Sequence, residues 1–221
     1  MISAVIFDLD GLLMDTEPVW HQARVELFKR FGLTWTKEDQ ERCMGVSTSF
    51  WVNAMAEKLG GRLSPPMVME EILSRMTECY ARGEVRILPG SHAALEFTSM
   101  KFRLGLASGS PHRLIDAALE GAKWTHYFRE VLSSDDVSAG KPSPDVYVEI
   151  MRRMRVRGHE TIVVEDSGNG IIAGLAATAN VVAVPNRYIR SSAEILGRAT
   201  VVLDSLEGLP AAIGQIERLD G

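Results

Sequence analysis

The feature that most constrains the fold is a series of short apolar runs, each followed by a polar or glycine-bearing segment. These runs are residues 4–7, 104–107, 131–132, 161–164, 181–184 and 201–203. Runs of this length are typical of strands that are buried on both faces of a parallel sheet. Between most of them lie segments with helical spacing, such as Val146, Ile150 and Met154. Alternating strands and helices predict a parallel sheet with helices on both faces.

The interval from Asp15 to about Val85 breaks this alternation, because it contains helical patterns in succession. The first predicted helix carries its apolar residues at Val19, Ala23, Leu27 and Phe31. A second is predicted to be capped by Ser47, and a third to open at Ser64 before Pro65 and Pro66. We therefore predict an α/β fold with a Rossmann-like three-layer core, residues 1–15 and 86–221, and an inserted all-helical domain, residues 16–85.

Charge and cysteine content narrow the class of partner. The 221 residues include 24 Lys and Arg against 29 Asp and Glu, a net charge of -5. This balance provides no basic surface for nucleic acid or an anionic membrane, so a small molecule is the expected partner. The two cysteines are too few for a disulfide framework. The N-terminus has no basic region, and no apolar stretch reaches the roughly 18 to 20 residues that span a bilayer, so we predict a cytoplasmic location.

Ligands of an open parallel sheet bind beyond the carboxyl ends of its strands, so the residues that follow each apolar run are informative. The first run leads into Asp8-Leu9-Asp10-Gly11, and the second into Ser108-Gly109-Ser110. Lys141 follows the third run, and the fourth leads into Glu165-Asp166-Ser167. Residues two apart on an extended chain point the same way, roughly 6.6 Å apart, so Asp8 and Asp10 are expected to face one site.

Four carboxylates at one sheet edge, from Asp8, Asp10, Glu165 and Asp166, repel one another unless protons or a cation neutralise them. Mg2+ prefers carboxylate oxygens and keeps a position for a phosphate oxygen, whereas zinc prefers the His or Cys ligands that this set lacks. The sequence therefore predicts a magnesium site.

A phosphate cradle is expected beside that metal. Ser108 supplies a hydroxyl donor, Gly109 permits close approach of the backbone, and Lys141 supplies a positive charge. A carboxylate so placed is able to attack phosphorus and form an aspartyl-phosphate, while a second carboxylate handles protons.

These residues in this order resemble the four motifs of the haloacid dehalogenase superfamily of aspartate-nucleophile phosphotransferases. Motif one is Asp8-Leu9-Asp10-Gly11, motif two contains Ser108, motif three is Lys141, and motif four is Glu165-Asp166-Ser167. The resemblance covers essentially the whole chain. The helical insertion is similar to the small cap of the branch that contains β-phosphoglucomutase and many sugar-phosphate phosphatases.

The resemblance implies a role for each motif residue. Asp8 would be the nucleophile and Asp10 the general acid, then base. Ser108 and Lys141 would bind the transferred phosphoryl group. Mg2+ would be held by Asp8, Asp166 and the backbone carbonyl of Asp10, with Glu165 joining directly or through water.

Departures from the family pattern favour one activity over its neighbours. The mutase branch carries a histidine where this chain has Trp20, and an arginine after Gly-Val-Ser where it has Thr48. Asp10 counts against a true dehalogenase, and residues 45–50 lack the cap lysine of phosphonate hydrolases. We expect a phosphatase for small esters, most of all phosphosugars, with a phosphosugar mutase as the alternative.

Some questions stay open at this point. A non-catalytic phosphate sensor that keeps the fold is the alternative from outside the enzymes. His21, on the first predicted helix, either meets the substrate or faces water, and Trp20 either packs in the core or covers a sugar ring.

Overall fold

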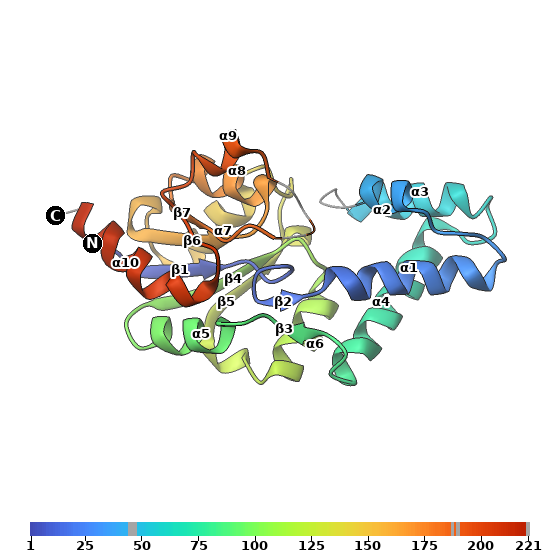
Figure 1. Cartoon of the computed structure of the whole chain (residues 1–221), viewed down its shortest axis with the longest axis horizontal. Coiled ribbons are helices and arrows are strands. Elements are labelled where there is room, and N and C mark those ends of the chain that lie inside the picture. Colours follow the sequence, from blue (N-terminus) through green and yellow to red (C-terminus); the bar gives the residue numbers. More distant parts are fainter. Residues whose placement is uncertain (44–47, 187, 189–190, 220–221) are drawn as a thin grey trace.

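A computed structural model describes residues 1–43, 48–186, 188 and 191–219 (Figure 1). Six strands form one parallel sheet in the order β5-β4-β1-β6-β7-β8. The strands are β1 (Ala4–Phe7), β4 (Arg103–Ser108), β5 (Phe128–Ser133), β6 (Thr161–Glu165), β7 (Asn180–Ala183) and β8 (Val201–Val202). Every apolar run that predicted a strand therefore overlaps one, with Val184 and Leu203 just beyond the ends of β7 and β8, and the α/β fold class is confirmed.

The central strand β1 shows why the sheet is covered on both faces. Ala4 and Ile6 belong to one buried cluster, whereas Val5 and Phe7 belong to a second, as the alternation of side chains along a strand requires. All four residues are fully buried. Helices α7 and α8 pack on the first face, and α5, α6 and α10 pack on the second. The helices are α5 (Ser91–Ser99), α6 (His112–Ala122), α7 (Asp145–Met154), α8 (Gly168–Ala176), α9 (Ala193–Leu196) and α10 (Leu209–Leu219).

The insertion is a group of helices at one end of the sheet, opposite the chain termini (Figure 1). It contains α1 (Glu17–Arg30), α2 (Lys37–Cys43), α3 (Thr48–Lys58) and α4 (Pro65–Ala81). We call these four helices the cap. The predicted apolar face of α1 is present, since Val19, Ala23 and Leu27 are buried. Ser64 stands at the N-cap of α4 without a side-chain capping bond, and Ser47 lies outside the described residues.

Two short strands connect the cap to the sheet. In this neck, β2 (Met14–Asp15) and β3 (Arg86–Ile87) pair antiparallel, with Met14 opposite Ile87 and Asp15 opposite Arg86. The side chains of Asp15 and Arg86 form an ion pair. Two-residue strands are too short for a periodic pattern, so the sequence did not predict the neck. The proposed division at residues 15/16 and 85/86 stays a prediction.

No helix among the described residues is both long and apolar enough to cross a membrane. The cytoplasmic location stays a prediction.

Candidate active site

The predicted site residues converge where three neighbouring parallel strands end. Asp8 follows β1 directly, Ser108 ends β4, and Glu165 ends β6 with Asp166 after it. The register sets Phe7 opposite both Leu106 and Val164, so the residues that follow arrive at the same edge. The side chains of Asp8, Glu165 and Asp166 are buried, at 5%, 0% and 2% exposure.

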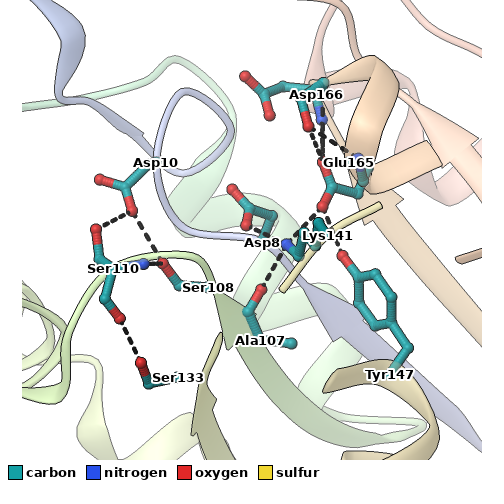
Figure 2. Close-up of polar contacts among 12 residues, drawn as sticks. Asp8, Asp10, Ala107, Ser108, Ser110, Ser133, Lys141, Tyr147, Glu165 and Asp166 are labelled. Atoms are coloured by element: carbon teal, nitrogen blue, oxygen red, sulfur yellow. Dashed lines mark hydrogen bonds and ion pairs between the residues drawn. The ribbon is translucent and has the colours of Figure 1, made fainter. Parts of the chain in front are cut away.

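Lys141 joins these strand ends (Figure 2). Its Nζ donates to Asp8 Oδ1 at 2.6 Å, to Glu165 Oε1 at 2.6 Å and to the carbonyl oxygen of Ala107 at 2.9 Å. Burial lowers the pKa of Lys141, but the charges of Asp8 and Glu165 outweigh it and hold that pKa well above its ordinary value. The lysine is therefore a fixed cation at the centre of the site.

Carboxylate oxygens of Asp8, Glu165 and Asp166 lie within 4.8 Å of one another. Burial is the largest influence on Asp8 and raises its pKa to about 8, with Lys141 opposing the rise and Glu165 adding to it. Burial and the charges of Asp8 and Glu165 also raise the pKa of Asp166 well above its usual range. One lysine cannot balance three ionised carboxylates. The set consists of hard oxygen donors without His or Cys, so it fits a divalent cation such as Mg2+.

Asp10 lies apart from that cluster, on the other side of Asp8 (Figure 2). Its Oδ2 accepts hydrogen bonds from the hydroxyls of Ser108 at 2.9 Å and Ser110 at 2.8 Å. Asp10 Oδ1 is buried and has no hydrogen-bond partner among the described residues. Two predicted site residues, Asp10 and Ser108, are thus brought into direct contact, and one carboxylate oxygen of Asp10 remains for a ligand.

Tyr147 is a part of the site that no sequence motif indicated. Its hydroxyl donates to Glu165 Oε1 at 2.6 Å, and the whole side chain is buried. The other oxygen of Glu165 accepts the backbone N–H groups of Asp166 and Ser167 at 3.1 and 3.3 Å. Tyr147 lies on the buried face of α7, six residues after Lys141 in the sequence. A buried tyrosine among apolar residues needs a hydrogen-bond partner for its hydroxyl, and this was the signal that could have indicated it.

The segment after Glu165 is shaped to bring the helix α8 close to the site. Ser167 caps α8, because its side chain accepts the backbone N–H of Gly170. A β-carbon on Gly170 would overlap the carboxylate of Glu165, so the first turn of α8 packs directly on that side chain. This close approach requires glycine at position 170.

A cleft of about 640 Å3 separates the sheet edge from the cap. Asp8, Asp10, Gly109, Lys141 and Asp166 line its core side, together with Ser110. Glu17, Trp20, Arg24 and Trp51 line the cap side. Trp20 is 8% exposed. It packs in the main hydrophobic cluster and also borders the cleft. His21 is exposed, with its Nδ1 3.4 Å from Gln40 Oε1, and it is not among the residues that line the cleft.

Comparison with known proteins gives a consistent result. The family model for haloacid dehalogenase-like hydrolases matches residues 5–184. The chain is 33% identical over 180 residues to a phosphorylated carbohydrates phosphatase of Thermotoga maritima, covering 80% of this chain and 82% of that protein. It is 29% identical over 214 residues to hexitol phosphatase B of Escherichia coli K12, with 95% of each chain covered.

Solved structures show the same arrangement. CbbY from Rhodobacter sphaeroides in complex with phosphate superposes with a TM-score of 0.85 at 25% identity, covering 95% of this chain and 96% of that one. A putative β-phosphoglucomutase from Thermotoga maritima superposes with a TM-score of 0.77 at 28% identity, covering 97% and 99%.

Proposed function

The chain belongs to the haloacid dehalogenase-like hydrolase family, and we propose that it is a Mg2+-dependent phosphatase of small phosphate esters. Phosphosugars are the proposed substrate class, because the similar proteins include a phosphorylated carbohydrates phosphatase and a hexitol phosphatase. The observation that carries the proposal is the placement of Asp8, which borders the cleft and bonds Lys141 within a cluster of three buried carboxylates.

The phosphoryl group is proposed to bind on the core side of the cleft. Lys141 is proposed to supply positive charge there, and the hydroxyl of Ser108 to turn from Asp10 to a phosphoryl oxygen. Gly109 leaves room for close approach because nothing lies within 4 Å of where its β-carbon would be. Lys141 also favours the ionised form of Asp8, since its ammonium group donates to Oδ1.

The reaction then proceeds in two steps. A carboxylate oxygen of Asp8 forms a bond to phosphorus as the ester P–O bond breaks, and the carboxylic acid of Asp10 gives its proton to the departing oxygen. Water next attacks the aspartyl-phosphate at phosphorus and gives a proton to the Asp10 carboxylate. The P–O bond to Asp8 breaks, which releases phosphate and restores Asp8.

Asp8, Asp166 and the backbone carbonyl of Asp10 are proposed to hold Mg2+, with Glu165 bound directly or through water. When bound, the ion supplies positive charge that offsets the carboxylates and the incoming phosphate. Tyr147 and Lys141 hold Glu165 in place through its Oε1. The hydroxyl of Ser110, bonded to Asp10, orients the proton carrier.

The test is phosphate release from hexose, pentose, triose and nucleotide phosphates, with and without Mg2+, for the wild type and Asp8→Asn. We expect metal-dependent release that is selective for some sugar phosphates and falls by at least about three orders of magnitude in Asp8→Asn, because the nucleophile is lost. Asp116→Asn, an exposed position on α6, is the matched control and should keep full activity.

Two other results would point elsewhere. A phosphosugar mutase is the second candidate, since the chain superposes on a putative β-phosphoglucomutase. Slow release with every ester, but conversion of β-glucose 1-phosphate to glucose 6-phosphate when a bisphosphate primer is added, would support it. Phosphate binding without turnover, altered only in affinity by Asp8→Asn, would instead support a sensor.

A further inference from the structure

The cap wall of the cleft contains a buried cation that the proposed chemistry does not use. Arg24 lies on α1 with only 4% of its surface exposed, and it lines the cleft opposite the carboxylates of the core. Its Nε and Nη1 atoms are buried and have no hydrogen-bond acceptor in the described part of the chain. A buried guanidinium with unsatisfied donors is costly for the folded protein unless an anion completes it.

The surroundings of Arg24 hold the guanidinium in place without satisfying its donors. Its Cζ lies 5.2 Å from the ring centroid of Trp20 and 6.0 Å from that of Trp51. Trp20 and Arg24 are four residues apart on α1, so they share one helix face. The ring faces attract the positive charge but accept none of the N–H groups that lie in the plane of the guanidinium. Those N–H groups therefore remain available to an acceptor.

One carboxylate, that of Glu17, is close enough to influence Arg24. It lies seven residues earlier on α1, and its Oε2 also has no partner among the residues that the structure describes. Burial is the largest influence on Glu17 and raises its pKa, while Arg24 opposes the rise and Asp10 and Asp15 add to it. Burial thus disfavours ionisation of the Glu17 carboxyl, which is the charge that would neutralise Arg24. An anion from outside the chain is therefore the better partner.

We propose that Arg24 forms a subsite for a second anionic group, carboxylate or phosphate, on the leaving group of the ester. The inference rests on the proposed function, because it assumes that the phosphoryl group binds on the core side near Ser108 and Lys141. A hydroxyl would leave the guanidinium charge unbalanced, whereas a carboxylate or phosphate matches both its charge and its two-donor fork. The preferred substrate is then an ester that is anionic at both ends.

Binding of matched ligands tests this subsite without turnover. Asp8→Asn is titrated calorimetrically, with Mg2+, against glycerol 3-phosphate and 3-phosphoglycerate, then against sorbitol 6-phosphate and 6-phosphogluconate. In each pair a carboxylate replaces a hydroxymethyl group at the far end. Fructose 1-phosphate and fructose 1,6-bisphosphate form the phosphate pair. We expect the doubly anionic member of at least one pair to bind about ten- to a hundredfold more tightly.

The variant Asp8→Asn/Arg24→Met should lose that difference, because Met keeps the volume and removes the charge. Arg24→Lys, which keeps the charge without the fork, should retain part of it. Arg30→Met is the matched control, since Arg30 lies on the same helix but pairs with Glu71 at the surface, and it should keep the whole difference.

The subsite would be overturned if the two members of every pair had dissociation constants within about twofold of each other. It would also be overturned if Arg24→Met weakened the binding of both members of a pair equally. Thermal unfolding provides a second readout: removal of an unpaired buried charge should raise the Tm of Arg24→Met. A lower Tm with the pairwise difference retained would show a purely structural role and also overturn it. Hydrolysis of p-nitrophenyl phosphate by the wild type tests the phosphatase proposal separately, because that ester has no second anion.

Discussion

The amino group of Lys141 is shared between two carboxylates that would otherwise repel each other. It donates to Asp8 and to Glu165 at the same distance of 2.6 Å, and its third donor reaches the carbonyl of Ala107. All three donors of the ammonium group are therefore used, and the side chain is 10% exposed. Lys141 forms ion pairs with Asp8 and Glu165, whereas its charge is only a minor influence on the pKa of Asp166. Asp166 is therefore the least compensated carboxyl of the three, and a divalent cation fits beside it.

This charge distribution predicts a pH dependence of stability for the metal-free protein. Burial raises the pKa of Asp8 to about 8, so between its ordinary value near 4 and about 8 the folded protein holds a proton that the unfolded chain has released. Folding then binds protons, and the free energy of unfolding falls as pH rises across that window. Thermal melts in EDTA should show a Tm that declines from about pH 5 to pH 8.

Mg2+ and Asp8→Asn are the two controls for this dependence. Excess Mg2+ should raise the Tm more at the upper end of the window than at the lower end, because ionised carboxylates bind it and protonated ones do not. Asp8→Asn removes one of the two buried carboxyls whose pKa is raised and should make the decline in EDTA shallower, with Asp166 contributing the rest. A Tm that is constant or rises across the window in the metal-free wild type would contradict the assignment.

At the scale of elements, the helix α8 begins in direct contact with the site. Its residue Gly170 leaves no space for a β-carbon beside Glu165. Gly170→Ala should therefore displace Glu165 from Lys141 and Tyr147, with a loss of about 1–3 kcal/mol in stability and at least about tenfold in kcat. Urea unfolding and steady-state kinetics of the variant measure the two effects.

Gly214→Ala is the matched control for this substitution. Gly214 also lies within a helix, α10, where the nearest atom to a new β-carbon is Arg218 Nη1 at 3.7 Å. Alanine there should stabilise the protein by roughly 0.5–1 kcal/mol, because it favours the helical backbone more than glycine does. If Gly170→Ala behaves like Gly214→Ala, the first turn of α8 does not position Glu165.

The strands were predictable because buried parallel strands are apolar throughout and end abruptly in polar residues. Asp8, Ser108, Glu165 and Asp166 could all be found as the residues that follow such runs. Lys141 was found as the lysine that follows the third apolar run, although it lies eight positions after the end of β5. These positions could be predicted because they depend on local pattern alone, and their roles stay predictions.

Features that depend on tertiary contact could not be found in this way. The hydrogen bonds from Ser108 and Ser110 to Asp10 join residues about a hundred positions apart, so no local pattern indicates them. Tyr147 and Arg24 are polar residues on the buried faces of their helices. The sequence shows that they are out of place there, but it does not indicate which groups they contact. Ser110 resembles a helix cap in the sequence, yet Pro111 stands at the N-cap of α6 and Ser110 turns to Asp10 instead.

At the scale of the whole molecule, one hydrophobic cluster extends from the sheet into the cap. It includes Val5 and Phe7 of β1 together with Trp20, Trp51 and Met55 of the cap. Helix α4 of the cap also packs on α6 of the core, where Arg113 bonds Glu70 at 2.8 Å. The two parts therefore share buried apolar surface and are expected to lose it together.

We predict that cap and core unfold in a single cooperative transition. The four tryptophans make this measurable, because Trp20 and Trp51 lie in the cap, Trp35 lies in the connection between its helices α1 and α2, and Trp124 lies in the core. In Trp124→Phe, tryptophan fluorescence reports only the cap, while far-ultraviolet circular dichroism reports the whole chain. The two urea transitions should coincide in midpoint.

Wild-type protein serves as the control for the loss of the Trp124 side chain. If the fluorescence midpoint of Trp124→Phe falls at a lower urea concentration than the dichroism midpoint, the cap unfolds on its own and the shared cluster does not couple the two parts.

The neck has a consequence for how such a molecule can be altered. The chain leaves the core at Asp15 and returns at Arg86, two residues that face each other across one pair of antiparallel strands. Because its two ends are adjacent, the inserted segment can be replaced by another of different sequence joined at the same two strands. The register of β1, β4 and β6 does not depend on that segment. Glu17, Trp20 and Arg24, which line the cleft, all belong to the inserted segment. Changes in that segment can therefore alter the lining of the cleft and leave Asp8 and Lys141 in place. We therefore expect substrate preference to follow the inserted segment and the chemistry to stay with the sheet.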